Sequence, residues 1–178
     1  MEEDPIKNYI ELYELTKSGY ADEMAGIREL EEKASRYLSV MGILLGVSSL
    51  GAKFIIDNFS SFQTWFDAAV NAILFMFLLL AFITTYSLFT IFKTSKLNHI
   101  PINQELVDFF SHHSYLDSIF ALTRGIVDAV ATNRIVRLEK IRRLSDSYIL
   151  MICSIFLLAL FTSALLARPF VNSIIASH

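Results

Sequence analysis

The sequence predicts an all-α membrane protein with three transmembrane helices, an amphipathic N-terminal arm and a long cytoplasmic helix that continues into the third span. Three apolar stretches support this prediction: Tyr37 to Ile56, Phe66 to Phe92 and Tyr148 to Ala167. Each reaches the roughly 20 mostly apolar residues that a helix needs to cross about 30 Å of hydrocarbon. Because the chain has 178 residues, of which 54% are hydrophobic, we expect one membrane domain with cytoplasmic extensions.

The distribution of Lys and Arg predicts the orientation of the spans. Five basic residues precede the first span and eight lie between residues 93 and 147, whereas the link from Asp57 to Trp65 has none. Lys and Arg in short loops tend to stay on the cytoplasmic side, so the N-terminus is expected inside and the C-terminus outside. The expected parts are a cytoplasmic arm (1–36), a transmembrane hairpin (37–92), a cytoplasmic helical module (93–147), a third transmembrane helix (148–167) and an external tail (168–178).

The N-terminal arm is expected to be an amphipathic helix. Its apolar side chains recur three, four or seven residues apart, which places them on one stripe, at Ile6, Ile10, Tyr13, Tyr20, Met24 and Ile27. The arm also carries ten acids against five bases.

Two interpretations of the arm stay open: a helix packed on the protein's own cytoplasmic face, or a gate that gathers several copies over a shared pathway. Gly19 lowers helix stability by about 1 kcal/mol relative to Ala and would suit a joint. The candidate gate residues are Tyr20, Met24, Ile27, Glu29, Glu31 and Glu32.

The first two spans contain candidate packing and pore residues. Gly42 and Gly46 lie four apart, a spacing that lets two helices approach closely in lipid and favours oligomers. Asn71 is expected at a helix contact or a wet pathway, because its amide is harder to satisfy within its own helix than a hydroxyl is. The hydroxyls of Thr84, Thr85, Ser87 and Thr90 are expected to bond back to their own helix.

The third span is expected to extend a long cytoplasmic helix. After Pro101 the sequence suits a short helix, and Ser114 to Asp117 forms a pattern like a capping box. From there to Ala167 no proline intervenes, which gives a helix of 54 residues, about 80 Å long, unless the chain folds back at Gly125. Its apolar stripe needs cover, either from neighbouring chains or from the arm, and this is the main sequence argument for an oligomer.

A basic cluster lies on that helix just before the membrane. It either anchors the helix to lipid phosphates or binds a soluble anion such as a nucleotide or oligonucleotide. Its members are Arg134, Arg137, Lys140, Arg142 and Arg143.

Motifs for catalysis, cofactors and metals are missing from the sequence. There is no glycine-rich phosphate loop, no zinc motif and no nucleophile beside a base, so neither an enzyme nor a cofactor is expected. Asp108 with His112, and His113 with Asp117, give only two ligands each, which is too few for a metal site.

Two stretches resemble small transmembrane effectors of bacterial anti-phage systems. The entry to the first span, Glu32 to Arg36 followed by Leu38 to Gly46, is similar to the start of Pycsar transmembrane effectors. The second stretch runs from Leu122 to Asp128 and on through Lys140 to Tyr148, and resembles their cytoplasmic helix leading into the last span. In size, span count and acidic arm, the chain also resembles the channel effector of the Hailong system.

The resemblance implies a homo-oligomeric pore, expected to be a tetramer, in the bacterial inner membrane, which depolarises the cell in abortive infection. It further implies a regulator made by a partner nucleotidyltransferase or cyclase: a single-stranded DNA oligomer in Hailong-type systems, or a cyclic nucleotide in Pycsar-type systems. Glu105 to Phe110 departs from the aromatic-glycine segment of the Pycsar loop, which favours the DNA oligomer. Two alternatives are a non-conducting adaptor that recruits a soluble partner and a holin-like lysis protein.

Overall fold

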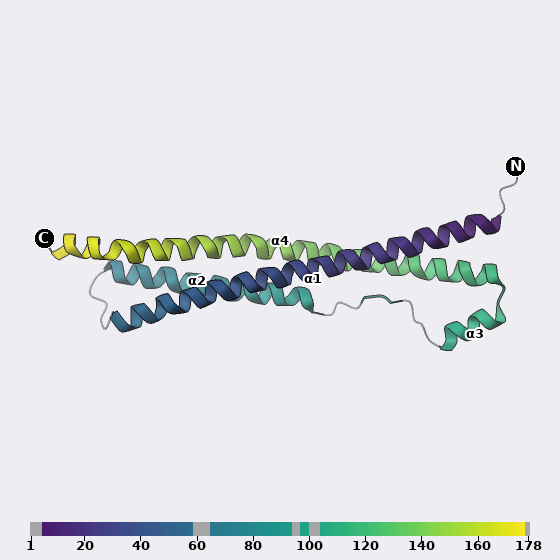
Figure 1. Ribbon diagram of the computed structural model, residues 1–178, viewed down its shortest axis with the longest axis horizontal. Coiled ribbons are helices and arrows are strands. Elements are labelled where there is room, and N and C mark those ends of the chain that lie inside the picture. Colours follow the sequence, from purple (N-terminus) through teal and green to yellow (C-terminus); the bar gives the residue numbers. More distant parts are fainter. Residues whose placement is uncertain (1–4, 59–64, 94–96, 100–103, 177–178) are drawn as a thin grey trace. The chain divides into compact units, whose positions relative to one another are not determined.

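The computed structural model describes residues 5–58, 65–93, 97–99 and 104–176, and the regular secondary structure in these ranges is entirely helical (Figure 1). The helices are α1 (Pro5–Asn58), α2 (Trp65–Phe92), α3 (Gln104–His112) and α4 (Tyr115–Ala176). Three of them contain stretches long and apolar enough to cross a membrane, within Ile6–Lys53, Trp65–Phe92 and Tyr115–Val171. The predicted all-α fold with three candidate spans is confirmed.

The chain divides into two units. The arm unit comprises Met1–Glu31 and Lys93–Arg142, and the span unit comprises Glu32–Phe92 and Arg143–His178. This division is close to the expected one between cytoplasmic and membrane parts. The borders between the two units lie after Glu31 in α1 and after Arg142 in α4, a few residues before the apolar stretches begin.

Both long helices are more continuous than the sequence suggested. α1 passes Gly19 without a break, so the arm and the first span form one helix. α4 passes Gly125 without folding back, and Ser114 caps its start: its Oγ accepts a hydrogen bond from Asp117 N at 3.2 Å and donates one to Asp117 Oδ2 at 2.6 Å. Ser114 is therefore the N-cap of α4, as the pattern predicts, and Gly19 is not a joint in this structure.

The expected helix end at Ala167 is wrong, because α4 continues through Pro169 to Ala176. Proline removes one backbone donor, but apolar spans tolerate it where neighbouring groups hold the helix. Arg168, the preceding residue, provides such an anchor: its Nε donates a hydrogen bond to Asp67 Oδ1 of α2 at 2.8 Å. The first part of the expected external tail is thus the last turns of a packed helix.

A seven-residue repeat of buried side chains organises the helices. Repeats of this length are the mark of coiled-coil packing, in which every second turn of a helix presents the same face to its neighbour. In α2 the buried positions alternate three and four apart: Asp67, Val70, Leu74, Phe77, Ala81, Thr84, Leu88 and Ile91. In α1 they lie seven apart at Ile27, Ala34, Met41 and Ser48, and in α4 at Ile119, Ile126, Asn133, Lys140, Ser147, Ser154 and Phe161.

In the span unit, α1 and α4 run parallel and α2 runs antiparallel to both. Tyr37 and Tyr148 bring their ring centroids to 5.7 Å, and Gly51 contacts Phe161 further along both helices. The Oγ atoms of Ser87 and Ser147 lie 2.8 Å apart near one end of the α2–α4 pair, and Asp67 and Arg168 meet at the other. These alternating directions are those expected of three successive membrane crossings.

The polar residues of the spans are satisfied mainly within their own helices. As expected, Thr84, Thr85 and Thr90 donate hydrogen bonds to carbonyls three or four residues earlier. Asn71 does the same: its Nδ2 donates to Asp67 O at 2.9 Å. The expected helix contact or wet pathway at Asn71 stays a prediction. The outer face of α2 is apolar, with Phe75, Phe82 and Phe89 each at least 60% exposed, as suits contact with hydrocarbon.

Close packing of α1 on α4 depends on Gly51. A Cβ at this position would lie 2.9 Å from Phe161 Cε1, and Phe161 is 1% exposed, so neither group has room to move. We expect Gly51→Ala to lower the free energy of unfolding by about 1–3 kcal/mol through overpacking. Chemical denaturation in detergent, followed by far-UV circular dichroism, measures it.

Gly46→Ala is the matched control, because nothing lies within 4 Å of a Cβ there. We expect it to change stability by under about 1 kcal/mol, in the stabilising direction, since Ala is the better helix former. Equal effects at the two glycines would contradict the packing of Gly51 against Phe161.

In the Asp67–Arg168 pair, loss of one member is expected to destabilise the span unit more than loss of both members. The Asp67 side chain is 1% exposed, so removing Arg168 leaves a buried carboxylate without its main counter-charge. We expect Arg168→Leu to cost about 3–5 kcal/mol, and the double variant Asp67→Leu/Arg168→Leu to recover most of that loss. A double variant as unstable as the single one would show that the pair itself matters little.

Candidate functional site

The candidate site is the contact between the N-terminal part of α1 and the first half of α4, both within the arm unit. Tyr9 packs edge-on against Phe120 at 6.2 Å between centroids, and contacts further along both helices join Glu23 to Arg137 and Glu31 to Lys140. Because residues later in α1 contact residues later in α4, the two helices run parallel. These contacts show that the arm packs on its own chain, and its role as a gate stays a prediction.

Burial of the arm increases toward its C-terminal end. Ile6 and Ile10 are 42% and 38% exposed, whereas Ile27 is 2% exposed and packs in the same unit as the equally buried Ile126 and Ala129. The expected apolar stripe therefore exists, but only its second half is covered. The covered half is the part that carries the two ion pairs.

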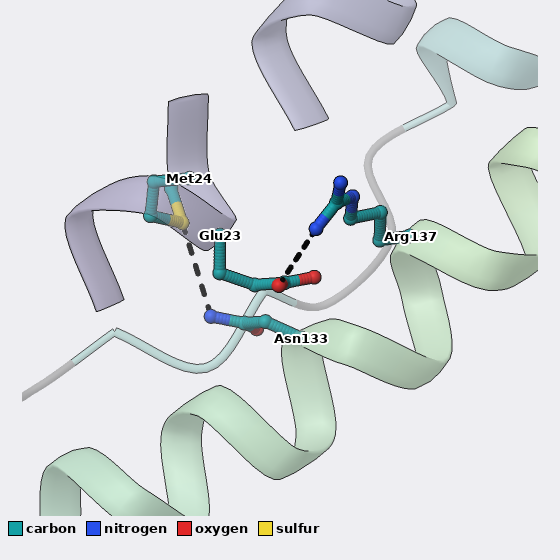
Figure 2. Close-up of polar contacts among 4 residues, drawn as sticks. All are labelled: Glu23, Met24, Asn133 and Arg137. Carbon is teal, nitrogen blue, oxygen red and sulfur yellow. Dashed lines mark hydrogen bonds and ion pairs between the residues drawn. The ribbon is translucent and has the colours of Figure 1, made fainter. Parts of the chain in front are cut away.

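Two ion pairs cross from the arm to α4. Arg137 Nη1 donates a hydrogen bond to Glu23 Oε2 at 3.0 Å, as Figure 2 shows. Lys140 Nζ donates to Glu31 Oε1 at 2.5 Å. In each pair one member is buried and the other is accessible: the side chains of Glu23 and Lys140 are 10% and 5% exposed, and those of Arg137 and Glu31 are 40% and 37% exposed.

A buried amide fixes the connector that precedes α3. Asn133 is fully buried, its Oδ1 accepts a hydrogen bond from Asn98 N at 2.9 Å, and its Nδ2 donates to Asn98 O at 3.2 Å. The same nitrogen lies 3.8 Å from Met24 Sδ of the arm (Figure 2). Next to it, Tyr20 Oη lies 3.4 Å from His99 Nδ1. Asn133 thus joins the arm, the connector and α4.

The structure does not place the five predicted phosphate-binding residues on one surface. Arg134, Arg137 and Lys140 follow one another at intervals of three along α4, but Arg142 lies about 200° around the helix from Lys140. Arg143 belongs to the span unit. Arg137 and Lys140 already bond to acids of the arm, so a phosphate would reach Lys140 only by displacing Glu31. Phosphate binding by these residues stays a prediction.

The predicted gate residues divide into an inner and an outer set. Ile27 is buried, Tyr20 and Met24 are half-buried, and all three belong to the contact with α4 and its connector. Glu31 is paired with Lys140, whereas Glu29 and Glu32 are exposed. The predicted packing glycines, Gly42 and Gly46, are exposed, and a Cβ at either position would have no atom of another described helix within 4 Å.

The histidine pair ends α3. His112 Nδ1 lies 2.8 Å from Asp108 O, and His113 Nδ1 lies 2.9 Å from Phe109 O while its ring stacks on Phe109 at 3.9 Å. Both side chains therefore contact carbonyls near the C-terminal end of α3. The described residues contain no group of three or more potential metal ligands.

Sequence reasoning missed Glu23, Asn133, Asp67 and Arg168 as contact residues. For Asn133 the sequence did contain a signal of burial. Asn133 continues the seven-residue series of Ile119 and Ile126, as Lys140 also does, and this series places both residues in the seam of α4. A polar residue at a seam position needs a partner and fixes the register of the helices. No such signal exists for the Asp67–Arg168 pair, since its members lie 101 residues apart.

Comparison of the chain with protein-family models, with curated proteins and with solved structures finds no match. The contacts described above are therefore the observations from which a function can be proposed.

Asn133→Ala tests the junction. It removes both hydrogen bonds to the Asn98 backbone, so we expect a loss of about 1–3 kcal/mol in stability and faster amide exchange at residues 97–99. Thr132→Ala is the control, because its exposed hydroxyl only bonds back to Asp128 O, and we expect a change within about 0.5 kcal/mol. Unchanged exchange at residues 97–99 in the Asn133 variant would contradict the junction.

Proposed function

We propose that the protein is a homo-oligomeric, tetrameric ion channel effector of an anti-phage defence system. Its arm gates conduction, and basic residues of α4 bind a phosphate-bearing regulator. The regulator is a single-stranded DNA oligomer, or alternatively a cyclic nucleotide, supplied by a partner nucleotidyltransferase. The defence role and the regulator come from the resemblance to Hailong-type and Pycsar-type effectors, and the location is the bacterial inner membrane with the N-terminus in the cytoplasm.

The observation that supports gating is the docking of a charged arm on a helix of the same chain. The arm is the start of α1, whose later part is a candidate span, and its acids bond to α4, whose later part is another. A gate needs an element with two arrangements that a ligand can favour unequally. An arm held mainly by two ion pairs and a short apolar contact is such an element.

The energy required of a regulator is modest. Moving a gate from mostly closed to mostly open takes about 5.5 kcal/mol of differential binding. Shared among four subunits, this is about 1.4 kcal/mol at each site, which is close to the net contribution of one hydrogen bond to a charged group. One altered ion pair per subunit would therefore suffice.

The charge of the arm favours cations as the conducted ions. Glu29 and Glu32 are exposed near the point where α1 passes from the arm unit into the span unit. Acidic rings at the mouth of a pore select cations. Four copies of these residues would form such a ring.

A second candidate function is a non-conducting anchor that recruits a soluble partner. It is favoured by large apolar side chains that stay exposed on the arm-unit part of α4: Phe120 at 54%, Ile135 at 69% and Leu138 at 59%. Ile135 and Leu138 lie one turn apart on the same side of α4, and contiguous exposed apolar surface marks contacts with other proteins. In the channel proposal the same residues contact neighbouring subunits.

Current through planar bilayers tests the channel. We expect discrete cation-selective currents from the full-length protein, larger currents after deletion of residues 1–26, and smaller currents when short single-stranded DNA is added. Deletion of residues 1–8 is the control, because it keeps the contact of Tyr9 with Phe120 and both inter-helix ion pairs. It should leave the current close to that of the full-length protein.

The outcome of the recordings separates the candidate functions. Silence from every variant, with insertion verified, would overturn the channel and leave the anchor. Equal currents from the full-length protein and the 1–26 deletion would support the pore but contradict its gating by the arm.

A further inference from the structure

We propose that the arm and a phosphate-bearing anion compete for Arg137 and Lys140, so that anion binding undocks the arm. Glu23 and Glu31 act in this scheme as internal competitors of the anion. The inference rests on the proposed function, because it takes the basic residues of α4 as the regulator's site, and it adds how occupancy of that site reaches the arm. In this scheme the docked arm leaves the pathway open and the released arm closes it, which agrees with a current that rises when the arm is deleted and falls when DNA is added.

The first support is the geometry of the two ion pairs. The carboxylates of Glu23 and Glu31 occupy donor groups of Arg137 and Lys140 at 3.0 Å and 2.5 Å. Carboxylate and phosphate oxygens use the same donors, and an arginine fork binds either of them with two parallel bonds. A phosphate therefore cannot take the full set of donors while both glutamates stay in place.

The second support is the order in which an anion would meet these groups. Arg134 is exposed one turn before Arg137, and the Arg137 side chain is itself 40% exposed. The Lys140 side chain is 5% exposed and lies behind Glu31. An anion can thus bind Arg134 and Arg137 first and then displace Glu31, which is 37% exposed and can turn into solvent.

The third support is that docking leaves Glu23 incompletely bonded. Its side chain is 90% buried, and its Oε1 is buried without a hydrogen-bond partner among the described residues. A buried oxygen that lacks a partner has lost its hydration without compensation. The lost hydration of Glu23 Oε1 therefore opposes docking of this turn, and release of the arm lets water bind the carboxylate again.

The fourth support is the contact of Arg137 with Gly26. A Cβ at Gly26 would lie 2.9 Å from both Cζ and Nε of Arg137, so the guanidinium lies directly against the backbone of the arm while it bonds to Glu23. The docked arm therefore fixes the position of the guanidinium. An anion that draws Arg137 away removes the contact with Gly26 and the bond to Glu23 together.

Competition predicts how the affinity for a phosphate-bearing anion changes when docking of the arm is weakened. If two events exclude one another, weakening the first strengthens the second by up to the same factor, and the full factor is reached while the first event still predominates. We expect Glu31→Gln to bind a polyphosphate more tightly than the natural chain, by roughly the 5-fold or more that is usual for coupled sites. Asp22→Asn is the matched control: it removes the same charge from an exposed neighbour of Glu23 and leaves both ion pairs intact.

The experiment measures arm docking and anion affinity on the same full-length protein. The protein is placed in phosphatidylcholine nanodiscs at low salt, and tripolyphosphate or a five-nucleotide single-stranded DNA is added. Hydrogen exchange of the amides between Tyr20 and Glu31 reports docking, and isothermal titration reports affinity. Nanodiscs containing phosphatidylglycerol, without a soluble anion, test whether lipid phosphates act in the same way.

We expect either soluble probe to speed exchange across Tyr20 to Glu31 at least severalfold, and Glu31→Gln to raise its affinity while Asp22→Asn does not. If exchange speeds up only with phosphatidylglycerol, the competitor is the lipid headgroup, and the competition stands with that source. If the probes bind equally well to all three proteins and leave exchange unchanged, the phosphate site stands and the competition is overturned.

A last variant covers the case in which the arm excludes the probe completely. Glu23→Gln/Glu31→Gln weakens both competitors and keeps side chains of the same size. Binding seen only in this double variant would support the competition. No binding to any variant in either kind of nanodisc would overturn both the phosphate site and the competition, whereas the bilayer currents would still decide the channel on their own.

Discussion

The seven-residue repeat of buried positions is the constraint on which the structure depends. In α4 it places Ile119, Ile126, Asn133 and Lys140 on the same face of the helix, and Ser147, Ser154 and Phe161 continue it. A helix with this period must keep one face against its neighbours over many turns. Because two of these positions are strongly polar, the seam cannot close by apolar contact alone: Asn133 needs the backbone of Asn98, and Lys140 needs Glu31.

The two units meet this constraint by different means. In the span unit the seam uses small hydroxyl residues, such as Ser147 and Ser154, which return their hydrogen bonds to their own helix and let neighbours approach closely. A charge pair, Asp67 with Arg168, holds the far end of α2 and α4. In the arm unit the seam uses groups that need partners from other segments. Such contacts specify register more than they add stability.

This difference suits the proposed roles of the units. Contacts that are satisfied within one helix survive small movements of its neighbour, as a conducting or anchoring span requires. Contacts between Glu23 and Arg137 and between Glu31 and Lys140 exist only while the arm is docked, so they can be exchanged for contacts with another anion. The arm unit is therefore the part of the chain where a soluble signal can act with little energy.

The helices, the three apolar stretches and the cap at Ser114 could be predicted from the sequence, because these depend on hydropathy, period and neighbouring residues. The sequence also predicted the amphipathic arm and the long helix that passes Gly125 into the third span, though not that α1 runs unbroken past Gly19 or that α4 continues past Pro169. Only the tertiary structure decided which basic residues of α4 meet the arm and which face solvent, since this depends on the register of two helices about 110 residues apart. Long-range pairs such as Asp67 with Arg168 leave no local pattern, because either residue alone suits the end of a span.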